Sequence, residues 1–319
     1  MALTPQQISY IVFGIVIILA LVFDLGLLSK KNAVVTIKKA LTQTIFWVVL
    51  ALGFGIFVWF EDGPKHAVEY LSAYLMEWSL SIDNIFVFIL IFTFFGIKEK
   101  FYGRLLLIGI LLAILLRVIF ISVGIVLIER FTWVLWIFGA ILLWTGIKMF
   151  TTKHDEEPDL SNNRVYKFLQ RVFPLTHEDG NGSFVVYREG KKYYTILFVA
   201  VIMLATTDIL FALDSIPAVF AITQDRLIVY TSNIFAVLGL RSLFFLLKGA
   251  VNKFAYLQQG IAIVLVFIGL KMLAEIFHLK IPSYISLLVI ILCIGLSIVY
   301  SATVAKKETD PDMEQKDLH

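Results

Sequence analysis

The stretch YTILFVAVIMLATTDILFALDSIPAVFAIT, residues 194–223, is almost entirely apolar and yet holds two aspartates, Asp208 and Asp214. A helix needs about 20 apolar residues to cross a hydrocarbon core about 30 Å thick, and this stretch is long enough. An ionised side chain near the middle of a bilayer costs about 2.5–3.5 kcal/mol on insertion scales. The stretch therefore predicts a transmembrane helix whose carboxylates need a compensating partner.

A second apolar stretch, residues 67–95, repeats this arrangement. Glu77 precedes Asp83 by six residues, as Asp208 precedes Asp214, and each second aspartate is followed by a small polar residue. Carboxylate, amide and hydroxyl oxygens are the ligands that hard cations prefer. The pattern indicates an intramembrane site for a divalent metal ion. Its candidate ligands are Glu77, Asp83, Asn84, Asp208, Asp214 and Ser215.

The composition is that of a polytopic membrane protein. Of the 319 residues 60% are hydrophobic and 16% are charged, whereas a soluble domain has about 45–50% apolar and about 25% charged residues. The mean hydropathy is +0.89. The net charge of +3 arises from lysines and arginines that flank apolar stretches, so no nucleic-acid partner is expected. The single cysteine, Cys293, excludes an intrachain disulfide, and no cofactor besides a bound or transported metal ion is expected.

The pattern of apolar stretches predicts an all-α protein with about nine transmembrane helices. Basic residues in the connecting segments alternate between the two sides. The positive-inside rule then places the N-terminus outside and the C-terminus in the cytoplasm, as an odd number of spans requires. The apolar stretches are residues 8–28, 41–60, 67–95, 104–127, 132–152, 194–223, 229–248, 259–278 and 282–303.

The likeness between the two acidic stretches continues downstream, where Arg117 matches Arg241 and the segment GIKM (146–149) matches GLKM (269–272). One three-helix unit is therefore predicted to occur twice, and an odd number of helices reverses the second copy. Inverted repeats of this kind are typical of secondary transporters, with the binding site at the repeat interface. The predicted parts are an N-terminal two-helix segment (1–65), repeat 1 (66–152), a cytoplasmic connector (153–193), repeat 2 (194–278), a final transmembrane helix (279–305) and a disordered cytoplasmic tail (306–319).

Local patterns give three further expectations. Apolar residues around Leu169 predict an amphipathic helix in the connector, and the segments 184–187 and 191–194, separated by Glu189-Gly190, predict a β-hairpin. Pro217 lacks a backbone donor and is expected to disturb the helical turn before it.

Buried bases offer the carboxylates a different partner. Arg117 and Arg241 lie in apolar stretches and could neutralise the acids without any metal ion. If Asp24 of the first stretch joins the four carboxylates, five acids face two arginines and three negative charges remain, which a divalent cation and one proton would balance. Asp24, Arg117 and Arg241 are therefore predicted to support the site.

Several segments resemble the TerC/Alx family of bacterial integral membrane proteins. The segments are EWSLSIDN (77–84), DILFALDSIPA (208–218), TSNIFA (231–236), GLR (239–241) and FIGLKM (267–272). The resemblance implies manganese export and metal homeostasis in the bacterial cytoplasmic (inner) membrane. It also implies that Glu77, Asp83, Asp208 and Asp214 bind Mn²⁺ with help from Asn84 and Ser215.

Two other functions stay open. A membrane metal chaperone or scaffold would bind Mn²⁺ and supply it to secreted proteins without transport. An intramembrane aspartyl protease could use paired aspartates as an acid/base dyad. Such proteases resemble one another through Tyr-Asp and Gly-x-Gly-Asp motifs, whereas Ile82 precedes Asp83 and Leu213 precedes Asp214 here. We therefore expect no enzymatic activity, and the sequence predicts no oligomeric state.

Overall fold

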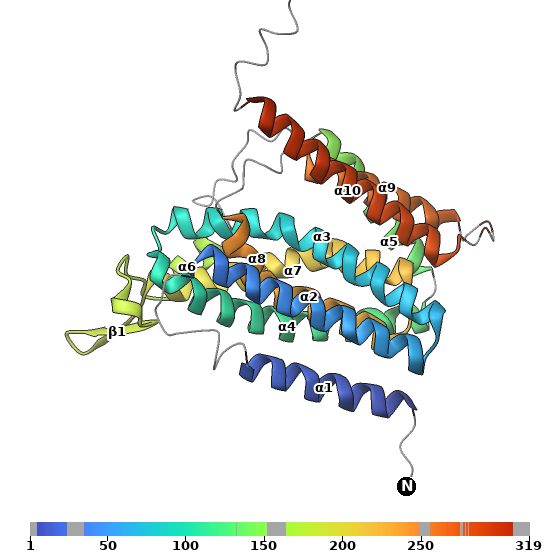
Figure 1. Cartoon of the computed structure of the whole chain (residues 1–319). Coiled ribbons are helices and arrows are strands. Elements are labelled where there is room, and N and C mark those ends of the chain that lie inside the picture. Colours follow the sequence, from blue (N-terminus) through green and yellow to red (C-terminus); the bar gives the residue numbers. More distant parts are fainter. Residues whose placement is uncertain are drawn as a thin grey trace, which may run out of the picture.

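The described part of the chain consists of ten α-helices, one short 3₁₀ turn and one β-hairpin (Figure 1). The computed structural model describes residues 5–23, 35–131, 133–151, 164–248, 256–274, 277, 279 and 281–308. The elements are α1 (Pro5–Phe23), α2 (Ile37–Glu61), α3 (Pro64–Phe94), α4 (Glu99–Arg130), α5 (Val134–Thr151), α6 (Arg164–Val172), η3 (Gly180–Gly182), β1 (Val185–Arg188), β2 (Lys191–Tyr194), α7 (Ile196–Ile222), α8 (Arg226–Leu247), α9 (Leu257–Ala274) and α10 (Ser283–Glu308).

Each apolar stretch predicted from the sequence coincides with one long helix, so the prediction of a helical membrane protein is confirmed. Among the described residues, five helices are long and apolar enough to cross a membrane. They are Ile37–Glu61, Glu99–Arg130, Ile196–Ile222, Arg226–Leu247 and Ser283–Ser301, and shorter apolar helices cover Gln7–Val22, Val134–Phe150 and Gln259–Ala274. The count of nine crossings stays a prediction.

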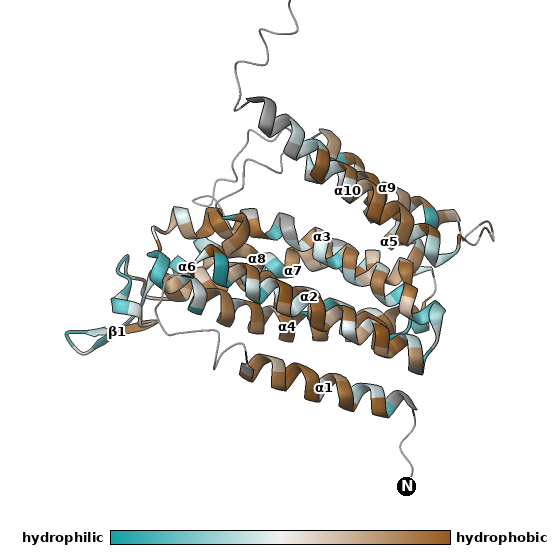
Figure 2. Cartoon of the chain, in the orientation of Figure 1, coloured by the Kyte–Doolittle hydropathy of each residue, from teal (hydrophilic) through white to brown (hydrophobic). Residues whose placement is uncertain are grey.

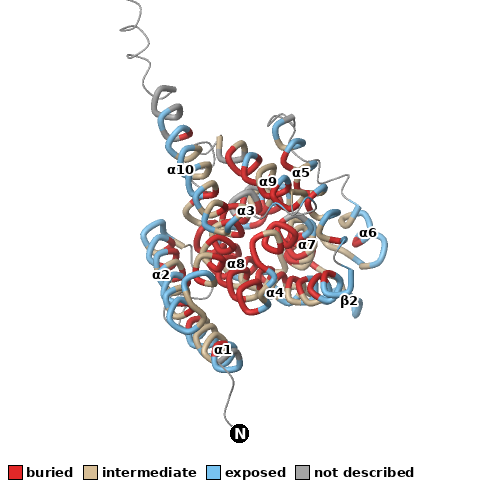
Figure 3. The backbone as a smooth tube through the Cα atoms, turned by 90° about the vertical axis from the view of Figure 1, so that its right-hand side faces the viewer, coloured by how far each residue is buried: buried red, intermediate tan, exposed pale blue. Residues whose placement is uncertain are grey.

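The long helices lie side by side, and α8 is at the centre of the bundle. It packs against α2, α3 and α4, and most of its side chains are buried. The tube coloured by burial has α3, α7 and α8 in the interior, whereas α1, α2 and α10 turn exposed faces outward (Figure 3). Those outward faces are largely hydrophobic (Figure 2), as expected for surfaces that contact lipid.

Helix α7 runs without interruption through Pro217, so the expected disturbance does not end the helix. It ends at Ile222, with Thr223 as its C-cap, and α8 begins at Arg226. Asp225 caps α8, because its Oδ1 accepts a hydrogen bond of 3.1 Å from the backbone amide of Ile228. The turn between these helices is therefore short and fixed by local hydrogen bonds.

Helices α5 and α9 pack closely because glycines line their contact. A Cβ atom added to Gly146 would lie 2.9 Å from the carbonyl oxygen of Ala262. A Cβ atom added to Gly269 would lie 2.8 Å from the carbonyl oxygen of Gly139. Both distances are shorter than real Cβ contacts, so only glycine permits this backbone approach.

The connector forms a small cap at the end of the bundle where α3 ends and α7 begins (Figure 1). Its helix α6 buries Leu169, and its hairpin pairs Val185 with Tyr194. Both elements confirm the sequence prediction. Lys98 holds the cap to the α3–α4 turn through an ion pair of 2.6 Å between its Nζ and Oδ2 of Asp179. The part of the connector from residue 164 onward is therefore a folded element that is tied to the helices.

Candidate functional site

Arg117 of α4 forms the centre of an ionised cluster in the interior of the bundle. Its side chain is only 2% exposed. The guanidinium binds Asp208 of α7 through two parallel hydrogen bonds, Nε to Oδ2 at 2.7 Å and Nη2 to Oδ1 at 2.9 Å. Its Nη1 donates to Oε1 of Glu77 on α3. One arginine thus joins two carboxylates from the two predicted repeats.

Two neutral side chains complete the surroundings of Arg117. Nη1 lies 3.4 Å from Oγ of Ser215 on α7 and 3.4 Å from Oδ1 of Asn233 on α8. Both side chains are buried. Helices α3, α4, α7 and α8 therefore all contribute oxygen or nitrogen atoms to a single buried cluster.

Two polar atoms of this cluster have no hydrogen-bond partner within the described residues, namely Oε2 of Glu77 and Nδ2 of Asn233. Both side chains are at most 1% exposed. Buried polar atoms are almost always hydrogen-bonded, and an exception calls for an absent water, an ion or a functional role. Among the described side chains, none donates to Oε2 of Glu77, which makes this oxygen a potential ligand.

The two carboxylates and one guanidinium carry a net charge of −1 in a site closed to solvent. Desolvation of three ions costs several kcal/mol for each, and only good geometry and further hydrogen bonds offset that cost. The fork of two bonds between Arg117 and Asp208 has this geometry. Glu77 has a weaker arrangement, because only one of its oxygens is bonded.

Three of the six predicted metal ligands, Glu77, Asp208 and Ser215, meet at Arg117. Asn84 lies on α3 two turns beyond Glu77 and is buried. The backbones of Asp83 and Asp214 belong to α3 and α7, but their side chains lie outside the described set. Within that set, no three His, Cys, Asp or Glu side chains converge as a metal ion would require.

Of the three predicted supporting residues, Arg117 has the central position. Arg241 lies on α8 and is 7% exposed. Asp24 falls outside the described residues. For Glu77 and Asp208, the pairing with a buried base that the sequence left open is the arrangement observed.

Sequence reasoning did not identify Asn233 as a site residue. The signal that could have found it is an amide side chain inside the apolar stretch 229–248, where a polar group needs a partner. Its position on α8 places it against Arg117.

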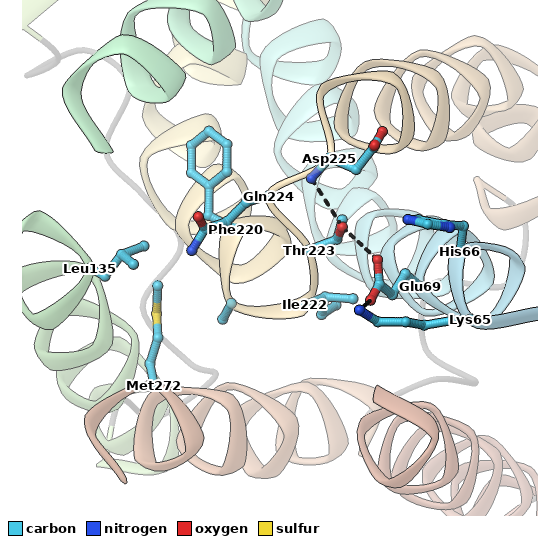
Figure 4. Close-up of a pocket in the computed structure, with 11 residues that line it drawn as sticks. Lys65, His66, Glu69, Leu135, Phe220, Ile222, Thr223, Gln224, Asp225 and Met272 are labelled. Atoms are coloured by element: carbon cyan, nitrogen blue, oxygen red, sulfur yellow. Dashed lines mark hydrogen bonds and ion pairs between the residues drawn. The ribbon is translucent and has the colours of Figure 1, made fainter. Parts of the chain in front are cut away.

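A polar cavity of about 400 Å³ opens near the start of α3 and the α7–α8 turn (Figure 4). Glu69 lines it, is 7% exposed and accepts a hydrogen bond of 2.8 Å from Oγ1 of Thr223. Nζ of Lys65 lies 3.8 Å from Oε1 of Glu69, and the backbone amide of Asp225 donates to Oγ1 of Thr223 at 3.2 Å. A chain of polar groups therefore links α3 to the turn. A second cavity of about 590 Å³ shares Lys65 and Glu69 with the first.

The chain is similar over most of its length to other membrane proteins. It is 43% identical to an uncharacterised membrane protein of Rickettsia felis over 92% of this chain and 97% of the relative. It is 45% identical to an uncharacterised membrane protein of Myxococcus xanthus, over 89% of both chains. It is 38% identical to Alx of Escherichia coli K12, named as a candidate membrane-bound redox modulator, over 92% of this chain and 93% of the relative.

No solved structure matches the chain. The sequence profile of the integral membrane protein TerC family, by contrast, matches residues 62–309, which include every helix of the cluster. The chain therefore belongs to the TerC family of integral membrane proteins.

Proposed function

We propose that this protein is a secondary transporter that exports a divalent cation, with Mn²⁺ as its cargo, through a carboxylate site between two inverted repeats. The observation that carries the proposal is the meeting of Glu77 and Asp208, both at most 1% exposed, inside an integral membrane protein. Ionisable groups within membranes are rare, and they mark ion pathways and coupling sites.

The contact between α5 and α9 supports the division into two equivalent units. Gly146 approaches Ala262 in one direction, and Gly269 approaches Gly139 in the other. Gly139 corresponds to Ala262 and Gly146 to Gly269 at the same sequence offset, so exchanging the two units turns one contact into the other. The helix pairs α3–α8 and α4–α7 are related by the same exchange. Such reciprocal packing is what a pseudo-two-fold axis between repeats produces.

The cavity of Figure 4 supplies one end of a path to the cluster. Glu69 in the cavity and Glu77 in the cluster lie on the same helix, about 12 Å apart along its axis at 1.5 Å rise per residue. On the predicted orientation the cavity faces outward, so it would be the side of release. The connector cap at the other end of α3 would then face the cytoplasm.

The choice of Mn²⁺ rests on the resemblance to the family, because oxygen ligands alone do not distinguish Mn²⁺ from Mg²⁺ or Ca²⁺. In this proposal Glu77 and Asp208 bind the cation together with Asp83, Asp214, Asn84 and Ser215. Asp83 and Asp214 add negative charge. The site therefore attracts a divalent ion although Arg117 already balances part of the negative charge.

The test is Mn²⁺ flux into proteoliposomes that contain the purified protein. We expect Asp83→Asn and Asp214→Asn each to lower the initial rate at least about tenfold, as loss of a ligand commonly does. Asp179→Asn, the same substitution in the connector, is the matched control and should retain the wild-type rate. Normal flux in both membrane variants would exclude the proposed site.

Three alternatives can be distinguished from transport. A metal chaperone or scaffold would bind Mn²⁺ without flux. The name of the relative Alx suggests redox modulation, but a chain with one cysteine, Cys293, cannot form an internal dithiol couple. Hydrolysis of a peptide substrate that depends on Asp83 and Asp214 would indicate a protease, and we expect no such hydrolysis.

A further inference from the structure

The guanidinium of Arg117 lies where a metal ion would find oxygen ligands. Around it are Oε1 of Glu77, both carboxylate oxygens of Asp208, Oγ of Ser215 and Oδ1 of Asn233. Every one of these atoms is an oxygen, and together they come from three helices. Oxygen donors of this kind are the ligands of Mg²⁺, Ca²⁺ and Mn²⁺. The arginine thus occupies a coordination shell suited to a hard cation.

We infer that Arg117 is a tethered competitor of the transported cation: it fills the empty site, and a divalent ion must displace it from Glu77 to bind. The inference rests on the proposed function and adds to it a residue that determines affinity. Glu77 is the contact that yields first, because Arg117 holds it through a single nitrogen, whereas it holds Asp208 through two.

The unpartnered atoms of the cluster support displacement. Oε2 of Glu77 is buried and accepts no hydrogen bond from any described residue, so a metal ion can bind it without breaking a bond there. A divalent ion also attracts the two carboxylates about twice as strongly as the single charge of a guanidinium at equal distance. The competition therefore favours the metal ion once it has lost its water, and favours Arg117 when no metal ion is present.

In a transporter, Arg117 would serve as the counter-ion of the carboxylates while no cargo is bound. Two buried carboxylates without a counter-ion would repel one another and would be costly to keep dehydrated. With Arg117 in place, the site stays closed after the cargo leaves, and one of the two negative charges is balanced. Replacing Arg117 should therefore destabilise the metal-free protein and strengthen metal binding at the same time.

The experiment follows thermal unfolding and Mn²⁺ binding of the purified full-length protein in lipid nanodiscs, titrated with MnCl₂. For Arg117→Gln we expect a lower Tm without metal, a larger rise of Tm with MnCl₂, and a Kd for Mn²⁺ at least about tenfold lower than wild type, which corresponds to about 1.4 kcal/mol. Arg117→Lys keeps the charge but loses the fork of two bonds, so its Kd should fall between the two.

Lys271→Gln is the matched control. Lys271 is also a buried cation, 3% exposed, but it lies on α9 and donates to Oγ of Ser286 on α10 at 3.0 Å. This variant should lose thermal stability without any gain in Mn²⁺ affinity. Arg117→Lys keeps a positive charge in the cluster and supplies a second test if Arg117→Gln does not fold.

The outcomes separate this inference from the proposed function. Wild-type flux together with an unchanged or weaker Mn²⁺ affinity in both Arg117 variants would overturn the competitor role and leave the transporter standing. Tighter Mn²⁺ binding by the variants without any wild-type flux would support the competitor role and refute transport. An equal gain in Mn²⁺ affinity in Lys271→Gln would also overturn the competitor role, because such a gain would not come from the release of Glu77 and Asp208.

Discussion

Arg117 stabilises the fold as well as occupying the site, because it satisfies charges on two helices that are far apart in the sequence. Glu77 and Asp208 would each be an uncompensated buried charge without it. Breaking a buried ion pair by removing one partner costs about 3–5 kcal/mol. The cluster therefore joins α3, α4 and α7 through electrostatics.

This leads to a prediction for Asp208. Replacing it with asparagine removes the fork of hydrogen bonds and one charge, and should lower the free energy of unfolding by about 3–5 kcal/mol. The measurement is chemical unfolding in mixed micelles, followed by circular dichroism. Asp225→Asn keeps a capping side chain on α8 and should change the free energy of unfolding by less than about 1 kcal/mol. Equal losses in the two variants would contradict the structural role of the pair.

At the residue scale, the sequence located the acids and left two kinds of partner open, a metal ion or the buried bases Arg117 and Arg241. The matching positions of Glu77 and Asp208 in two apolar stretches predicted that they would meet, and they do so through Arg117. Which cation lies between them could not be predicted, because Arg117 and a metal ion satisfy the same charge requirement. Asn233 was missed since a lone amide has no partner visible in sequence.

At the scale of elements, the crossing of α5 and α9 depends on the absence of side chains at two positions. We predict that Gly146→Ala will destabilise the protein by about 1–3 kcal/mol, because a new methyl group in a packed contact forces the backbones apart. Its Cβ would lie 2.7 Å from Cγ2 of Val266 and 2.9 Å from the carbonyl oxygen of Ala262. The measurement is the thermal unfolding midpoint in detergent.

Gly295→Ala on α10 is the control for this prediction. In the described part of the chain, no atom beyond the neighbouring backbone of α10 itself lies within 4 Å of a Cβ added there, so the substitution should be neutral or stabilising by up to about 1 kcal/mol through helix propensity. A loss of stability in Gly295→Ala as large as that in Gly146→Ala would show that close packing is not the cause.

The connector contributes a pH-dependent contact. The hydrogen bond from Lys98 lowers the pKa of Asp179, and the backbone amide of Asn181 adds to this effect. A carboxyl whose pKa is lower in the folded than in the unfolded state stabilises the fold only while it is ionised. The contribution is complete well above the unfolded pKa of about 3.9 and is lost as the pH falls through the lower folded value.

We therefore predict that the difference in Tm between wild type and Asp179→Asn is present at about pH 6 and disappears below about pH 3. Thermal unfolding at a series of pH values in nanodiscs measures it. Lys191→Gln in the hairpin, which leaves this contact intact, should show no such change with pH. A difference in Tm that is constant from pH 6 to pH 3 would exclude the ion pair as its origin.

The sequence predicted elements better than their packing. Length and apolar character were enough to place the long helices, and the alternation around Glu189-Gly190 was enough for the hairpin. Pro217 was expected to disturb α7, yet the helix continues through it. A proline removes only one donor, and the buried neighbours of α7 hold the helix on both sides of it.

At the scale of the whole molecule, the two ends of the bundle differ in charge, and this predicts the orientation in the membrane. Lys98, Lys100, Arg104 and Lys248 gather with the connector at one end, and basic residues favour the cytoplasmic side. In a Cys293→Ser background, Gln224→Cys should react with an impermeant thiol reagent added to intact cells. Glu189→Cys should react only after permeabilisation, and labelling of both from outside would contradict this orientation.

The likeness between the two acidic stretches was visible in the sequence because ionisable residues stand at matching positions, whereas the packing of the helices was not. Apolar side chains on long helices are interchangeable enough that sequence does not specify which helix meets which. The reciprocal glycine contacts of α5 and α9 become recognisable only when Gly139 and Ala262 are seen as backbone neighbours.

Thr223 has a consequence for motion. One hydroxyl donates to the Glu69 carboxylate and accepts from the Asp225 amide, so it ties the third helix to the link between the seventh and eighth. That link cannot tilt away from α3 without losing the bond to Glu69, and the bond from Asp225 fixes the position of the hydroxyl that makes it. Valine has the same shape but cannot make either bond, so with valine at this position α3 would separate from the link more readily.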